Sequence, residues 1–166
     1  MIVKNSQDEI QSYLTDAANV KGFCDAVFIP SDEKEIIEIL NEANRNKIPV
    51  TIAGNHTGLT GGAVPEGGYV ISLEKFNRIL SFNPDEKTVT VEAGVILKDL
   101  KEYLQEKNYF YPPDPTEENC FIGGTIATNA SGAKTFKYGP TRNFVKSITL
   151  ILPSGKSLYL QRGEVK

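Results

Sequence analysis

Residues 54–68 read GNHTGLTGGAVPEGG, and six of these fifteen residues are glycine. The run lies between two apolar, strand-like segments, residues 48–53 and 69–73. Glycine permits positive φ and close backbone approach, so such a loop leaves many N–H groups able to surround one anion. The chemistry that this pattern predicts is the binding of a pyrophosphate. A long flexible connection between strands is the open alternative, because glycine-rich loops are common.

This loop would bind an anion without cations. No Lys or Arg occurs between Lys47 and Lys75, and Glu66 is the one charged residue within the loop. Neutral backbone amides and the hydroxyls of Thr57 and Thr60 are therefore the predicted donors. Neither G-x-G-x-x-G before a helix nor the P-loop G-x-x-x-x-G-K-[ST] is present, so a dinucleotide would be bound on a different fold.

A second unusual segment, residues 122–132, reads IGGTIATNASG. It has few large side chains, and its small residues would let the backbone approach a flat ligand or a neighbouring element. The two interpretations, cofactor contact and tight packing of a helix, are equally compatible with this composition.

The elements that must position these segments follow from hydrophobic periodicity. Helices are predicted at about 6–15, from a cap at Ser31 to about residue 46, and at about 96–107. A proline-rich ordered loop is predicted at 111–115. Strands are predicted at 26–29, 48–53, 69–73, 79–82, 88–93, 145–152 and 157–160. The pattern indicates an α+β fold.

Composition limits the functional classes. A chain of 166 residues is long enough for a substantial core, and its net charge of −3 gives no electrostatic case for binding nucleic acid. The apolar runs are too short to span a membrane, and no signal peptide is recognisable, so a cytoplasmic location is expected. Cys24 and Cys120 are far apart and predicted to be reduced, and a single histidine excludes an ordinary histidine-rich metal site.

Several pieces, in a fixed order, carry a family resemblance. They are VFIPSDEKEIIEILNEANRNKIPVTIAGNHTGLTGG, TVTVEAGV, PPDPT, IGGTIATNASG, KYGPTRNFV and LILPSGK. Together they resemble the FAD-binding domain of the vanillyl-alcohol-oxidase (PCMH) type, in particular the branch of the glycolate oxidase subunit and the D-lactate or D-2-hydroxyacid dehydrogenases.

The resemblance implies a PCMH-type FAD-binding domain of two small α/β subdomains, with FAD held between them. The first would cover about 1–75 and the second about 76–166. The family's domain continues beyond the 145–160 hairpin and is followed by a substrate-binding cap, so this chain is expected to be the N-terminal, C-terminally incomplete part. The cofactor-binding residues implied are Gly54, Asn55, His56, Thr57, Gly58, Leu59, Gly61, Pro113, Asp114, Thr116, Gly123, Gly124, Ala127, Asn129 and Gly132.

Two residues, one in the loop and one directly before it, depart from the family's pattern. Ala53 stands where an arginine often precedes the first glycine, and His56 stands where glycine or asparagine is usual. In another branch the corresponding histidine is bonded covalently to the flavin. The surrounding residues resemble the non-covalent branch, so FAD is expected to be non-covalent, with a covalent link at His56 as the alternative.

The activity implied for the longer protein is the oxidation of a small 2-hydroxy acid of the glycolate or D-lactate type, by hydride transfer to flavin N5. The electron acceptor is not identified, and no catalytic residue is assigned within this chain, which by itself is expected to be inactive and to bind FAD weakly. A non-catalytic flavin- or nucleotide-binding module is the alternative of a different class. A peptidoglycan-precursor reductase of the same fold is a third, although PPDPT and KYGPTRN fit the hydroxyacid branch better.

Overall fold

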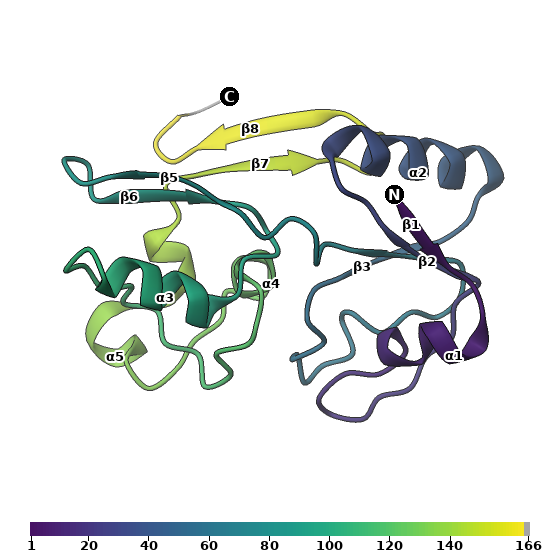
Figure 1. Ribbon diagram of the computed structural model, residues 1–166, viewed down its shortest axis with the longest axis horizontal. Helices are drawn as coiled ribbons and strands as arrows, with labels where there is room; N and C mark the ends of the chain where they lie inside the picture. Colours follow the sequence, from purple (N-terminus) through teal and green to yellow (C-terminus); the bar gives the residue numbers. More distant parts are fainter. Residues whose placement is uncertain (165–166) are drawn as a thin grey trace. The chain divides into compact units, whose positions relative to one another are not determined.

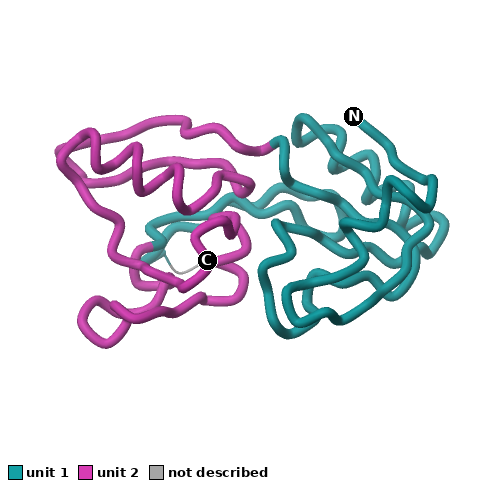
Figure 2. The backbone as a smooth tube through the Cα atoms, turned by 60° about the horizontal axis from the view of Figure 1, so that its bottom comes forward, with its two compact units in different colours: residues 1–75, 145–166 teal, residues 76–144 magenta. Residues whose placement is uncertain are grey.

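The computed structural model describes residues 1–164, which form two compact units, residues 1–75 with 145–164 and residues 76–144 (Figures 1 and 2). Both units mix helices with small sheets, which confirms the predicted α+β class. Within the described residues, no helix is long and apolar enough to cross a membrane. The cytoplasmic location stays a prediction.

The first unit is built on a four-stranded sheet in the order β1-β2-β4-β3. Strand β1 (Ile2–Lys4) is antiparallel to β2 (Ala26–Ile29), whereas β2, β4 (Tyr69–Ser72) and β3 (Val50–Ala53) are mutually parallel. All four residues of β2 are buried. Complete burial of a strand is typical of one that is covered on both faces of its sheet.

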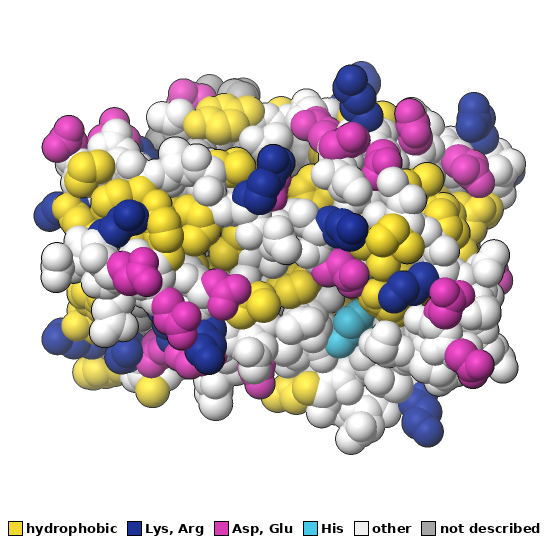
Figure 3. Space-filling model, in the orientation of Figure 1, with side chains coloured by type: hydrophobic (Ala, Val, Ile, Leu, Met, Phe, Trp, Pro, Cys, Tyr) yellow, Lys and Arg dark blue, Asp and Glu magenta, His cyan; other side chains and the backbone are white. Residues whose placement is uncertain are grey.

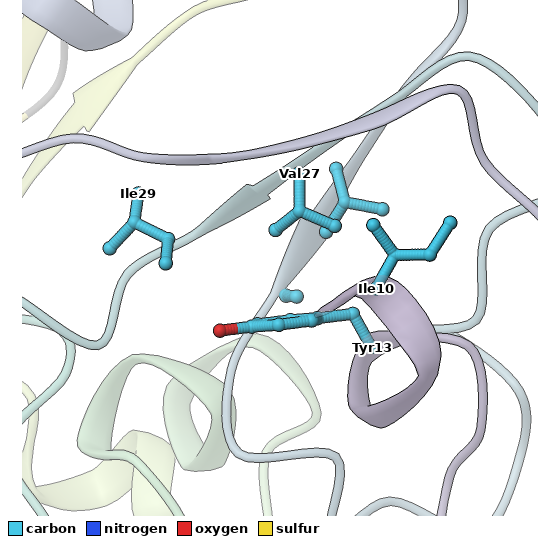
Figure 4. Packing of buried hydrophobic residues seen from close by; sticks show 6 residues of the cluster. Ile10, Tyr13, Val27 and Ile29 are labelled. Atoms are coloured by element: carbon cyan, nitrogen blue, oxygen red, sulfur yellow. The ribbon is translucent and has the colours of Figure 1, made fainter. Parts of the chain in front are cut away.

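Helices lie on both sides of this sheet (Figure 1). On one side are α1 (Gln7–Ile10) and the 3₁₀ turn Gln11–Tyr13, which pack Ile10 and Tyr13 against Val27 and Ile29 (Figure 4). On the other is α2 (Glu33–Asn46), whose predicted apolar stripe is buried. The members of that stripe are Ile36, Ile39, Leu40 and Ala43.

The start of α2 corrects one prediction. The capping side chain belongs to Asp32, which accepts the Glu35 N–H at 3.0 Å, and not to Ser31. Ser31 instead donates its own N–H to the Glu35 carboxylate at 2.7 Å. The helix therefore begins one residue later than the Ser31 cap implied. The two hydrogen bonds satisfy two backbone N–H groups at the N-terminus of the helix.

The hairpin of β7 (Ser147–Ile151) and β8 (Ser157–Gln161) lies with residues 1–75, although the sequence grouping placed it with the second subdomain. Its turn packs on α2. The Asn44 side-chain amide donates to the Pro153 carbonyl at 2.6 Å, and Gly155 lies against Asn41 and Ile37. These contacts join segments more than one hundred residues apart, which local patterns do not reveal.

The second unit has one antiparallel pair, β5 (Ile79–Asn83) and β6 (Thr88–Val91), and the helices α3 (Leu97–Gln105), α4 (Ile122–Ala127) and α5 (Thr135–Tyr138). A 3₁₀ turn follows at Thr141–Phe144. The inner face predicted for α3 is confirmed, because Leu97, Leu100 and Leu104 are buried. They share a core with Val95, Cys120 and Ile122.

Candidate functional site

The glycine loop joins β3 to β4, which are parallel neighbours in the sheet. The chain must therefore return from the carboxyl end of one strand to the amino end of the next, a connection that proteins usually make with a helix. Residues 54–68 make it with no helix and no strand. The backbone groups of the loop are thus not consumed by regular secondary structure.

Several of these groups have no partner among the residues that the structure describes. Within the described residues 1–164, the N–H groups of residues 56–60 donate no hydrogen bond. A Cβ placed on Gly58 or Gly62 would meet no atom within 4 Å. Available donors beside open space are what an anion such as a pyrophosphate requires, so the loop fits the phosphate part of a dinucleotide cofactor.

The reason for glycine differs along the loop. Gly61 has φ +75°, a conformation that side chains rarely adopt, and its N–H already donates to the Asp16 carboxylate at 2.8 Å. Gly58 does not have positive φ, so the space at its Cβ position, and not its conformation, distinguishes it. Of these two predicted contacts, Gly58 suits a ligand, whereas Gly61 serves the shape of the loop.

His56 has φ +51° and a half-buried side chain. Its ring meets the Tyr13 ring edge-on at a centroid distance of 5.9 Å, and both ring nitrogens are buried with no hydrogen-bond partner in the part of the chain that the structure describes. Part of the side chain of this single histidine is visible at the surface (cyan in Figure 3). Burial lowers the pKa of His56, and the Asp16 carboxylate partly opposes that effect. The ring is therefore neutral at pH 7.

The remaining loop positions are Asn55, Thr57 and Leu59. Leu59 is 70% exposed, so its apolar surface is accessible to a ligand. Thr57 is half-buried and Asn55 is exposed. Gly54 follows directly on Ala53, the buried last residue of β3, so the loop begins where the strand leaves the core.

In the second unit, the proline-rich segment is an irregular loop, as predicted. Its Asp114 carboxylate is bound by two lysines, Lys101 at 2.5 Å and Lys134 at 3.2 Å. The hydrogen bond from Lys101, supported by Lys134, holds the pKa of Asp114 below its ordinary value. The ion pairs fix the position of this carboxylate, and the contacts of Pro113, Asp114 and Thr116 with a flavin stay predictions.

The segment 122–132 combines both interpretations of its composition. A Cβ on Gly123 would lie 2.8 Å from the Ala93 Cβ, and one on Gly132 would overlap the Asp114 carbonyl. These two glycines therefore permit tight packing within their own unit. Gly124 and Ala127, by contrast, are exposed on α4, and a Cβ on Gly124 would meet nothing.

Asn129 has a local role in the second unit. Its φ is +50°, and its side-chain oxygen accepts the Arg142 N–H at 2.9 Å. The side-chain amide thereby links the residues after α4 to the turn at Thr141–Phe144. This bond uses one of the two lone pairs of the side-chain oxygen, and the contact with FAD that the resemblance implies stays a prediction.

The predicted site residues fall into two groups, the loop residues 54–61 in the first unit and the residues between 113 and 132 in the second. The residues of each group belong to one and the same unit. That FAD is held between the two subdomains stays a prediction. A residue that the sequence did not single out is Asp16, whose side chain holds the glycine loop from outside the motif.

Comparisons with known proteins cover most of the chain. The family described as "FAD binding domain" matches residues 24–160. The chain is 44% identical over 128 residues to a D-lactate dehydrogenase of Anaerostipes hadrus, covering 76% of this chain and 27% of that protein. It is 38% identical over 133 residues to the glycolate oxidase subunit GlcD of Bacillus subtilis (strain 168), covering 79% and 28%.

Among solved structures, 6-hydroxy-D-nicotine oxidase from Arthrobacter nicotinovorans aligns with a TM-score of 0.86. The identity is 17%, and the alignment covers 98% of this chain and 36% of that one. At this identity the likeness concerns the fold. The chain spans between about a quarter and a third of the length of the relatives that it matches.

Proposed function

The chain belongs to the FAD-binding-domain family, and we propose that it is the cofactor-binding part of a flavin-dependent oxidoreductase that oxidises a small 2-hydroxy acid. The names of the relatives, a D-lactate dehydrogenase and a glycolate oxidase subunit, support this substrate class. The single structural observation that carries the proposal is the glycine loop, where the amides of residues 56–60 donate to no group of the described chain and Gly58 has open space at its Cβ position.

The residues of the loop would hold the pyrophosphate of FAD. Amides of residues 56–60 donate to nothing else in residues 1–164, and no lysine or arginine lies in the loop to replace them. Neutral donors that are fixed in advance bind an anion without the cost of reorganising long side chains. The exposed Leu59 would add apolar contact beside them.

The second unit would contribute the surface for the flavin. Pro113 is buried and rigid, Thr116 is exposed, and the open face of α4 carries Gly124 and Ala127. The ion pairs of Asp114 with Lys101 and Lys134 would keep the proline-rich loop in place. A bound FAD would supply two-electron redox chemistry, for which these residues would provide the position of the flavin.

A titration of the 166-residue chain with FAD tests the cofactor assignment. We expect saturable, non-covalent binding, weak because the longer protein would supply part of the site, with flavin released on acid precipitation. Failure to bind FAD at millimolar concentration would remove the cofactor assignment.

The substrate class requires the longer protein that contains this chain. We expect its flavin to be bleached under anaerobic conditions by D-lactate or glycolate. If FAD is bound but neither acid bleaches it, the result would contradict the substrate class and favour a binding module.

A further inference from the structure

Asp16 precedes the glycine loop by about forty residues, yet its carboxylate lies against it. One oxygen accepts the N–H groups of Ala18 at 3.0 Å and Val20 at 3.1 Å, and the other accepts the Gly61 N–H at 2.8 Å. The side chain is 7% exposed. Partial desolvation opposes ionisation, but the three backbone donors prevail and hold the pKa of Asp16 below its ordinary value.

The same turn holds the loop at a second point. The Ala17 N–H donates to the Gly58 carbonyl at 3.2 Å, and the Val20 side chain lies 3.7 Å from the Cβ position of Gly61. Among residues 56–62, within the described chain, these two hydrogen bonds are the ones that join the loop to another segment. The turn of residues 16–20 therefore determines where Gly58 and Gly61 lie.

We propose that Asp16 is a positioning residue for the FAD pyrophosphate, an inference that rests on the function proposed above. Asp16 acts through the loop and need not touch the cofactor. Residues 56–62 form no helix or strand and would otherwise sample many conformations, and ordering them on binding would weaken affinity. Because the carboxylate binds the Gly61 N–H, it holds the loop in a conformation in which the amides of residues 56–60 remain available to the ligand.

A carboxylate near a phosphate also repels it, so the two effects of Asp16 have opposite signs. Replacement by asparagine separates them. The Asn oxygen can still accept from Ala18 and Val20, while its NH₂ group would face the Gly61 N–H and could not accept it. Positioning predicts that Asp16→Asn binds FAD more weakly, and simple repulsion predicts that it binds FAD more tightly.

The test measures dissociation constants for FAD and for riboflavin, which lacks the phosphates, in the 166-residue chain below its melting temperature. We expect Asp16→Asn to weaken FAD binding about tenfold, the effect of one lost hydrogen bond to a charged group, and to leave any riboflavin binding unchanged. Asp32→Ala is the matched control. It removes a carboxylate that accepts a backbone N–H in the same unit, so it should lower the melting temperature without changing FAD affinity.

The outcomes are distinct. FAD binding that is unchanged or tighter in Asp16→Asn overturns the inference and leaves the proposed function intact. Equal weakening by Asp32→Ala shows a general loss of stability and also overturns it. If Asp16→Asn does not fold, Asp16→Ser, whose short hydroxyl cannot reach Gly61, replaces it under the same criteria. A wild-type chain that binds no FAD overturns the proposed function and this inference with it.

Discussion

The two glycine-rich segments of this protein use the same residue for different physical purposes. In the loop at residues 54–62, Gly58 faces open space, and the loop is fastened by hydrogen bonds to the turn at 16–20. In the segment 122–132, Gly123 and Gly132 lie where a methyl group would strike the backbone or Cβ of a neighbour. The first kind of glycine is available to a ligand, whereas the second is required by packing.

The largest effect should come from a packed glycine. In Gly132→Ala, the new methyl would overlap the Asp114 carbonyl, so backbone must shift in two loops. We expect the second unit to lose about 3 kcal/mol of stability in urea unfolding. Gly124→Ala, in α4 with nothing near its Cβ, should gain about 0.5–1 kcal/mol because alanine favours a helix. A stable Gly132→Ala would contradict the packing assignment.

An open glycine should behave in the opposite way. Gly58→Val should change the urea midpoint little, because its side chain has room, and should weaken FAD binding by about tenfold or more, because it fills the space beside the amides. Fluorescence titration with FAD and circular dichroism measure the two quantities. Gly62→Ala, which is equally open but outside the predicted contacts, is the control. Unchanged flavin affinity in Gly58→Val would remove the loop from the site.

The two predicted cofactor segments are also held in place by different groups. Asp114 is fastened by cations, whereas the glycine loop contains none. Lys101→Met removes two ion pairs, at 2.5 Å to Asp114 and 2.7 Å to Glu118, from a partly buried site, and should cost about 1 kcal/mol at low salt and less at high salt. Lys98→Met, on the same helix with an exposed partner at 3.9 Å, should cost nothing measurable. Equal effects of the two variants would contradict a special role for Lys101.

The smallest effect concerns pH and the loop. Burial lowers the pKa of His56 in the folded chain below the ordinary value of about 6.5, so the unfolded chain takes up the proton first as pH falls. The contribution of His56 to the free energy of unfolding is therefore present above about pH 6.5 and is lost as pH falls below it. His56→Asn, which tolerates the observed φ of +51°, should lower the dependence of melting temperature on pH between 7 and 5. Parallel curves for the two proteins would contradict a buried neutral ring.

The sequence by itself determined the elements whose pattern is local. The spacing of Ile36, Ile39 and Leu40 specifies the buried face of α2, and the alternation around the turn at 153–156 specifies the hairpin, because both depend on neighbours along the chain. The order of the motifs similarly determined the family and its cofactor. Composition alone could not separate an open glycine from a packed one.

Only the tertiary structure decided which glycines are free and what holds the loop. Asp16 and Gly61 are 45 residues apart, and Gly132 meets Asp114 across a separate loop, so neither contact leaves a periodic trace in the sequence. The Lys101 and Lys134 partners of Asp114 likewise come from different elements. Such contacts depend on how the chain returns on itself, which is set by the topology of the sheet and the packing of the core, and not by local preference.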